Sequence, residues 1–495
     1  MQPKTTTFCY LYARITDSWK LGKARKAQKL VDLFLVCSSF LMFILVLSQI
    51  QTVIRVPLAL VTSCILPGYI IVRLSKIGRS LLDDLLLSFT LSLPFTFILS
   101  LFAFTICKIM PEVFLASMYL LFSLLLFRRS RSESTTKSNS SFLKISHISV
   151  MVLVIVFFAF AVLLIFPRAA FTPTDDILSH WSSTQIIVRS PKYCEGVEIL
   201  FHLLAGAIYV LSGSNIGIET LFTSLSLLNA FLFLSFYSMA KAYLNKDYTD
   251  LPFSLLIFTF FSGFGWLYVL KENIANPWNW QTILLGSFEK TYYDVGCGGS
   301  SWLYLFPRPL SLSFVLVFTL IYLLKRTDLT KRLFIIVDGL MVMALAFLHP
   351  PELIICTLFL AIMSILTPAT LKIRLDESLT ATFLGIVSAT LMSITFGFIN
   401  LGVNHPFPYF IILLGVILAS KLALRFRQKI LMPKVNRSLL IVLLYAVSIV
   451  YFYGLIVWIN VCEGFSLNLV GGWAAYLVPW DFYPSLLGVS GILAI

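Results

Sequence analysis

Long apolar runs separated by short polar connectors repeat along the chain from residue 31 onwards. An α-helix needs about 20 apolar residues to cross a hydrocarbon core of about 30 Å, so each run of that length predicts one crossing. We predict about thirteen transmembrane helices, and therefore an all-α polytopic integral membrane protein. The predicted crossings are 31–50, 54–73, 84–107, 111–127, 147–167, 217–241, 251–270, 309–324, 333–348, 352–370, 379–399, 407–424 and 438–460.

One apolar segment, 196–214, is too short to fit this pattern. Its apolar stretch runs only from Ile199 to Leu211 and includes His202, and a run of about 10–14 residues is more typical of an interfacial or re-entrant helix. If the segment stays on the outer surface, 29 of the 37 Lys and Arg residues fall in cytoplasmic loops; if it crosses, only 18 do. Because basic residues concentrate on the cytoplasmic side, we predict that it does not cross and that the N-terminus is cytoplasmic.

The polar connectors divide the chain into four parts. Residues 1–30 form a basic cytoplasmic tail, and 31–127 form an N-terminal four-helix membrane unit. Residues 128–146 are rich in Ser and Arg and lack apolar periodicity, which is typical of a flexible cytoplasmic linker. The remainder, 147–495, is a transmembrane core. Its long external loops are predicted at 168–216, 271–308 and 461–484.

The composition agrees with a membrane protein and excludes other classes. Apolar residues make up 59% of the 495 residues and charged residues only 12%, whereas soluble proteins have about 45–50% and about 25%. The net charge of +14 follows from basic cytoplasmic loops, so it does not indicate binding to nucleic acid. Three of the eight cysteines, Cys194, Cys297 and Cys462, fall in predicted external loops, which permits at most one disulfide and leaves the pair open.

An acid pair opens the first long external loop. Asp175 and Asp176 precede an amphipathic stretch at 177–190, and Asp176 shares a helical face with His180, four residues on. Adjacent carboxylates disfavour each other's ionisation, which can raise one pKa and suit that residue to act as a general base. The alternative is a helix start, where acids complement the macrodipole. Asp176 and His180 could also supply two ligands to a divalent metal.

Further candidate residues lie at the ends of later external loops. The aromatic loop 271–308 contains Lys290 and ends at Arg308, whose guanidinium could hold a phosphate with two parallel hydrogen bonds. The alternative for Arg308 is a snorkelling side chain at a helix end. His349 and Glu352 occupy an HPPE sequence between two crossings, where the simpler interpretation is a turn that ends one helix and begins the next.

This arrangement resembles the GT-C superfamily of membrane glycosyltransferases, which includes protein O-mannosyltransferases and aminoarabinose transferases. The resemblance covers roughly 147–495 and rests on the crossing at 147–167, the loop that opens with Asp175 and Asp176, and the external juxtamembrane helices at 177–190 and 196–214. The chain has no second DxD-type motif and no WWDYG-like motif, so oligosaccharyltransferase activity is not expected.

The resemblance implies a GT-C-like fold and a site at the outer leaflet of a membrane, which we expect to be a prokaryotic cell membrane. Members take a sugar from a polyprenyl-phosphate carrier and transfer it to a glycan, lipid or protein. In them an acid of the first loop acts as the base or orients the acceptor, which implies this role for Asp175 or Asp176. We expect Arg308, His349, Lys290, His180 and Glu352 to bind the substrate. No cofactor is required, although a divalent metal is compatible with the site.

Two alternatives remain open from the sequence. A lipid or polysaccharide transporter or flippase would place polar residues along the bilayer midplane. Asp338 is an acid within a predicted crossing and so a candidate functional residue, but it lies about two turns from the cytoplasmic end, near Lys331 and Arg332, where an ordinary ion pair explains it equally well. A purely structural membrane protein is the other alternative. The predicted spans are poor in charge and the acids cluster outside, which favours the transferase.

Overall fold

The computed structural model describes the residues 28–78, 80–132, 149–156, 158–159, 175–189, 198–243, 255, 309–366, 374–396 and 407–427. Every regular element within these ranges is a helix, which confirms the all-α prediction. Most of the crossing predicted at 147–167, and all but one residue of that at 251–270, lie outside the described residues. The crossing predicted at 438–460 and the loops at 271–308 and 461–484 lie outside them as well.

Six helices in the described ranges are long and apolar enough to cross a membrane, and several others are apolar but shorter. The protein is therefore embedded in a membrane. The six are Gln28–Leu47, Arg55–Ser75, Leu81–Thr105, Pro111–Arg128, Ile218–Tyr243 and Leu375–Thr395. The shorter apolar helices are Ile199–Leu211, Ser311–Leu324, Glu352–Ser364 and Leu413–Leu422.

The chain divides into two compact units, and the division falls inside one helix. Unit 1 comprises residues 1–144 and 203–217, and unit 2 comprises 145–202 and 218–495. Unit 1 contains the helices α2 (Arg55–Cys64), α3 (Leu66–Ser75), α4 (Leu81–Thr105) and α5 (Pro111–Ser132), together with most of α8 (Ile199–Leu211).

The second crossing is two helices, because the chain bends between α2 and α3. Ile65 has φ −122° and ψ −49°, outside the helical region, and Pro67 stands in the first turn of α3, where its missing N–H costs no hydrogen bond. At Gly68 a Cβ would lie 1.9 Å from the Ser88 carbonyl oxygen. Only glycine therefore allows α3 to approach α4 this closely, and its N–H donates to the Ser92 hydroxyl at 2.9 Å.

Within unit 1, a hydrogen bond from α2 holds the C-terminus of α8. The Arg55 guanidinium is buried, and its Nε donates to the carbonyl of Leu211 at 2.7 Å. The last carbonyls of a helix have no partner within the helix and carry the negative end of its dipole. Arg55 therefore supplies both a hydrogen-bond donor and a positive charge at the C-terminus of α8.

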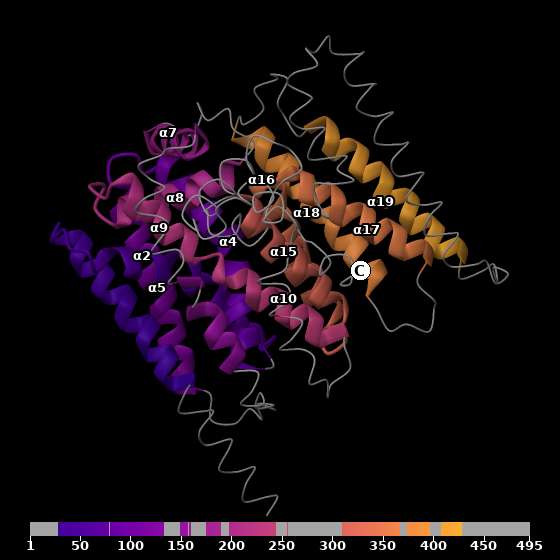
Figure 1. The fold of residues 1–495 in the computed structure, drawn as a ribbon, viewed down its shortest axis with the longest axis horizontal. Coiled ribbons are helices and arrows are strands. Elements are labelled where there is room, and N and C mark those ends of the chain that lie inside the picture. Colours follow the sequence, from indigo (N-terminus) through magenta and orange to yellow (C-terminus); the bar gives the residue numbers. More distant parts are fainter. Residues whose placement is uncertain are drawn as a thin grey trace, which may run out of the picture. The chain divides into compact units, whose positions relative to one another are not determined.

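Unit 2 contains the first residues of α8 and all of the later helices. These helices are labelled in Figure 1. The other helices of unit 2 are α7 (Asp175–Arg189), α9 (Ile218–Leu227), α10 (Ala230–Tyr243), α15 (Pro309–Leu324), α16 (Lys331–Leu348), α17 (Pro350–Leu366), α18 (Leu375–Thr395) and α19 (Phe407–Arg427). The crossing predicted at 217–241 consists of α9 and α10, separated by 228–229. Among the later helices, α16 packs against α18, and α17 against α19.

Small residues bring α16 and α18 into close contact. A Cβ at Gly385 would lie 2.7 Å from the Gly339 carbonyl oxygen, so a larger residue there would push the helices apart. Beside this contact the fully buried Asp338 accepts a hydrogen bond from the Ser378 hydroxyl at 2.8 Å. The acid predicted within a crossing is thus paired with a hydroxyl of the neighbouring helix.

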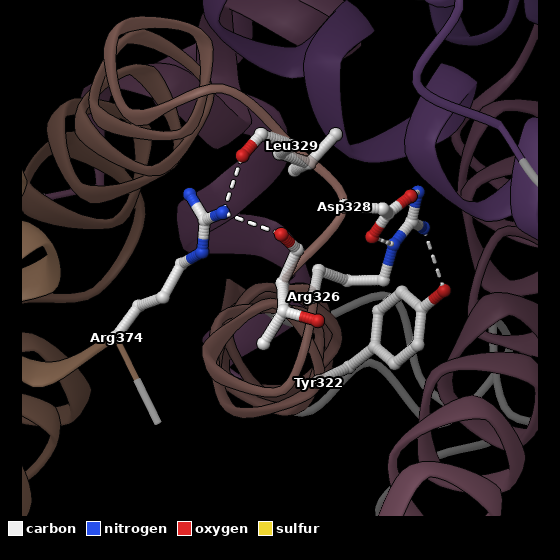
Figure 2. A network of polar contacts seen from close by, with 6 residues as sticks. Tyr322, Arg326, Asp328, Leu329 and Arg374 are labelled. Atoms are coloured by element: carbon white, nitrogen blue, oxygen red, sulfur yellow. Dashed lines mark hydrogen bonds and ion pairs between the residues drawn. The ribbon is translucent and has the colours of Figure 1, made fainter. Parts of the chain in front are cut away.

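The turn between α15 and α16 is held by two arginines (Figure 2). Arg326 is buried and donates to both Asp328 carboxylate oxygens, at 2.8 and 3.0 Å, and to the Tyr322 hydroxyl at 2.8 Å. Arg374, just before α18, donates to the carbonyls of Thr327 and Leu329. We call Tyr322, Arg326, Asp328 and Arg374 the arginine network.

Candidate functional site

His180 lies on the buried face of α7. Among the side chains described for this helix, 178–189, the buried ones are His180, Thr184 and Ile187. They stand at positions i, i+4 and i+7, which form one stripe on a helix surface. The Thr184 hydroxyl bonds back to the His180 carbonyl at 2.8 Å. The helical period of α7 therefore turns the His180 ring into the protein.

Glu198 and His202 come from the start of α8. Glu198 directly precedes the first residue of α8, and its carbonyl accepts the His202 backbone N–H at 3.2 Å, so His202 lies one turn further on. Residues four apart share a helical face. The apolar sequence of α8 buries His202, which is 3% exposed, while the Glu198 side chain keeps 26% of its surface exposed.

The three side chains converge. His180 Nδ1 lies 3.0 Å from His202 Nε2 and 3.5 Å from Glu198 Oε2. One ligand atom from each of the three residues lies within 4.8 Å of the others, as metal ligands do. The Phe201 ring packs edge-on against both histidines, with ring centroids 5.1 and 5.7 Å away, and so forms an apolar wall beside them.

The HPPE sequence joins the same group. His349 ends α16, and the two prolines begin α17, which places Glu352 in its first turn. His349 Nδ1 is hydrogen-bonded to Glu352, and His349 Nε2 lies 3.7 Å from Glu198 Oε1. The two Glu198 oxygens thus face different histidines, His180 and His349. We call His180, Glu198, His202, His349 and Glu352 the His/Glu cluster.

The cluster holds its imidazoles in different charge states. Burial, and next to it the neighbouring His180, lower the pKa of His202 to about 3, so this ring is neutral at neutral pH. For His349, burial opposes the charged form, but Glu352 and then Glu198 outweigh it and raise its pKa. One imidazole of the cluster is therefore favoured in its neutral form, which can bind a cation, and another is favoured by two carboxylates in its charged form, which can donate to an anion.

Three of the predicted site residues lie in this cluster, namely His180, His349 and Glu352. Helix α7 begins at Asp175, but the side chains of Asp175 and Asp176 are outside the described residues, as are Lys290 and Arg308. Catalytic and phosphate-binding roles for these four residues stay predictions. For His180, the nearby ligand-type atoms in the described part are those of His202 and Glu198.

Sequence reasoning missed Glu198 and His202 as site residues. Their four-residue spacing, an acid and a histidine on one helical face, was a signal of the same kind as that of Asp176 and His180. The apolar residues around them obscure this signal, because they also fit an interfacial or membrane-crossing helix. Their proximity to His180 follows from the pairing of α7 with the start of α8, which no local pattern encodes.

Comparison of the chain with protein-family models, with curated proteins and with solved structures finds no match. The function is therefore argued from the cluster itself.

Proposed function

We propose that the protein is a membrane glycosyltransferase with a GT-C-like fold. It moves a sugar from a polyprenyl-phosphate carrier to an acceptor hydroxyl at the outer leaflet, and the His/Glu cluster lies at its site. The proposal includes thirteen crossings, a cytoplasmic N-terminus and an external position for α7 and α8.

The observation that carries the proposal is the contact of Glu198 with both His180 and His349. His180 belongs to the helix that begins with the acid pair, and His349 belongs to the HPPE turn about 170 residues later in the chain. A purely structural role for the HPPE turn would need only the end of α16. Instead, α7 and the HPPE turn, two segments that stand out in the sequence by their polar residues, meet in a buried cluster of ionisable groups. Clusters of this kind are typical of functional sites.

The chemistry requires a base and a group that stabilises the leaving phosphate. The acceptor hydroxyl attacks the anomeric carbon as the bond from that carbon to the phosphate oxygen breaks. The hydroxyl proton passes to Asp175 or Asp176, and the carrier leaves as a polyprenyl monophosphate. Arg308, Lys290 and the imidazolium of His349 supply positive charge and donors for the departing phosphate. Glu352 and Glu198 keep that imidazolium charged.

The direct test is release of polyprenyl phosphate by the full chain in nanodiscs. A panel of polyprenyl-phosphate-linked sugars is supplied with simple glycan, lipid and peptide acceptors, and the released carrier is measured by mass spectrometry. We expect release from at least one donor. The Asp175→Asn/Asp176→Asn double variant should lose at least about 100-fold in rate, the usual contribution of a general base. It should fold normally, because Asn keeps the size of the side chain and loses only the small interaction of the charge with the helix dipole.

The matched control is Glu377→Gln, which removes a carboxylate from the first turn of α18. It should release the carrier at the wild-type rate. No release from any donor by the wild type would overturn the proposal, and wild-type rates in the double variant would remove the acid pair from it.

The orientation is tested by cysteine labelling after α8. A cysteine at Ser214 would occupy a left-handed backbone position, φ 58°, whereas Gly217 is exposed and a Cβ there meets nothing within 4 Å. With Cys194, Cys297 and Cys462 replaced by Ser, Gly217→Cys should react with an impermeant thiol reagent from outside. Labelling only from the cytoplasmic side would contradict the proposed topology.

A transporter or flippase is the second candidate, and Asp338 is the observation that favours it. Its carboxylate is fully buried between α16 and α18 and accepts a hydrogen bond from Ser378, as polar residues along a transport path do. This candidate predicts movement of the intact lipid-linked sugar without release of polyprenyl phosphate. The same nanodisc assay, repeated in vesicles that report lipid sidedness, separates the two.

A further inference from the structure

The atoms of His180, His202 and Glu198 are arranged as ligands of a single ion. We infer that His180 Nδ1, His202 Nε2 and a Glu198 carboxylate oxygen bind one divalent transition-metal ion, and Zn²⁺ is the ion that this ligand set fits. The site differs from the Asp176 and His180 pair that the sequence suggested, because two of its three ligands come from the start of α8.

The spacing of the ligand atoms supports the inference. Zinc binds imidazole nitrogen and carboxylate oxygen at about 2.0–2.2 Å, so neighbouring ligand atoms of a tetrahedral site lie about 3.3 Å apart. The two separations from His180 Nδ1 are 3.0 Å to His202 Nε2 and 3.5 Å to Glu198 Oε2. Two imidazoles with one carboxylate are also a ligand set of open zinc sites, which keep a fourth position for water.

The distribution of protons supports it as well. A neutral imidazole nitrogen carries either a proton or a lone pair, and a carboxylate oxygen only accepts. Without a cation, the 3.0 Å contact of His180 Nδ1 with His202 Nε2 needs a proton on one nitrogen and a lone pair on the other. A cation among the three ligand atoms would instead accept a lone pair from each of them.

The surroundings match those of a metal site. Metal-binding carboxylates are usually held by further polar groups, which orient them. Here His349 faces Glu198 Oε1, the oxygen that does not face His180, and Glu352 in turn bonds His349. Phe201 shields the histidines on one side. The partial exposure of Glu198 leaves an approach for the ion.

The test measures metal content and does not depend on transferase activity. Full-length protein is purified in nanodiscs, treated with a chelator, dialysed against Zn²⁺ and analysed by mass spectrometry for the metal. We expect about one Zn²⁺ per wild-type chain. His202→Gln and Glu198→Gln should lose at least 10-fold in affinity, while the Glu377→Gln control should bind like the wild type. Zn²⁺ should raise the Tm of the wild type and the control only.

Two results would overturn the inference. One is wild-type protein that retains no Zn²⁺ after dialysis, and the other is wild-type affinity in both cluster variants. If the variants do not fold, X-ray absorption of the zinc-loaded wild type decides, since the inference requires two imidazoles per ion. A chain that binds Zn²⁺ but releases no polyprenyl phosphate would refute the proposed function and leave the metal site standing.

Discussion

The arginine network and the His/Glu cluster are both buried polar centres of unit 2, but they balance their charges differently. Arg326 meets two carboxylate oxygens and a hydroxyl, so its donors face acceptors in a geometry that the guanidinium favours. In the cluster, His180 faces another imidazole and a carboxylate, and His349 lies between two carboxylates. Arg326 thus faces acceptors alone, whereas the cluster sets imidazoles beside carboxylates and beside one another.

We expect this difference to separate a structural polar centre from the proposed functional one. The network joins residues of one turn to the start of α18, and its bonds are explained by holding that turn in place (Figure 2). The cluster brings together α7, the start of α8 and the turn after α16, and it is where we infer a metal ion. We therefore expect mutations in the network to change stability and mutations in the cluster to change binding.

The largest effect on stability is expected for Arg326→Ala. It removes a buried cation and its hydrogen bonds, and leaves Asp328, whose side chain is 40% exposed, to be hydrated. We expect a loss of about 3 kcal/mol in the free energy of unfolding, the lower end for breaking a buried pair. Denaturant titration in mixed micelles measures it. The Zn²⁺ affinity of the folded fraction should stay unchanged, and a parallel fall in that affinity would erase the proposed distinction.

Arg308→Lys should affect binding and leave stability alone. Lysine keeps the charge but loses the planar fork that matches a phosphate, so we expect about 10-fold weaker binding of polyprenyl phosphate, or about 1.4 kcal/mol. Binding to nanodisc-embedded protein is measured for the wild type, Arg308→Lys and Arg308→Ala. Equal affinity in all three would favour a snorkelling side chain and remove Arg308 from the site.

Tyr322→Phe should cause a smaller loss of stability than Arg326→Ala. The change removes the hydroxyl that accepts from Arg326 Nη1 and leaves the bidentate pair with Asp328 intact. We expect about 1–2 kcal/mol, as for a hydrogen bond to a charged group. Comparing this variant with Arg326→Ala and with the double variant gives the coupling between the two residues. Additive losses would mean that the hydroxyl is not part of the network.

The smallest effect is expected for Lys331→Ala. The Lys331 side chain is 63% exposed and lies 4.0 Å from the half-exposed carboxylate of Asp376. Exposed ion pairs contribute less than about 1 kcal/mol, so the stability should change by no more than about 0.5 kcal/mol. A loss of stability comparable to that of Arg326→Ala would show that exposed charges contribute as much to the stability of this protein as buried ones.

The hydropathy pattern predicted the helices well where it was strongest. The amphipathic stretch at 177–190 is α7, Asp175–Arg189, and the run at 407–424 is α19, Phe407–Arg427. The pattern missed the breaks at Ile65 and at 228–229, because apolar residues continue through both. Pro67 was a local signal for the first break, since proline favours the start of a helix.

The candidate site was only partly predictable for a related reason. His349 and Glu352 form a local motif, and their contact depends on one turn. Glu198 and His202 become candidate site residues only through their contact with His180 on another helix, and no local sequence pattern predicts that tertiary contact.

Photocrosslinking shows whether the carrier phosphate binds at the His/Glu cluster, as we propose. A polyprenyl phosphate with a photoreactive group beside the phosphate is incorporated with the wild-type chain in nanodiscs, and labelled peptides are mapped by mass spectrometry. We expect labels within 175–202 and at 349–352, and we expect unlabelled polyprenyl phosphate to reduce them by competition. Labels confined to the arginine network, at 322–328 and 374, would contradict it.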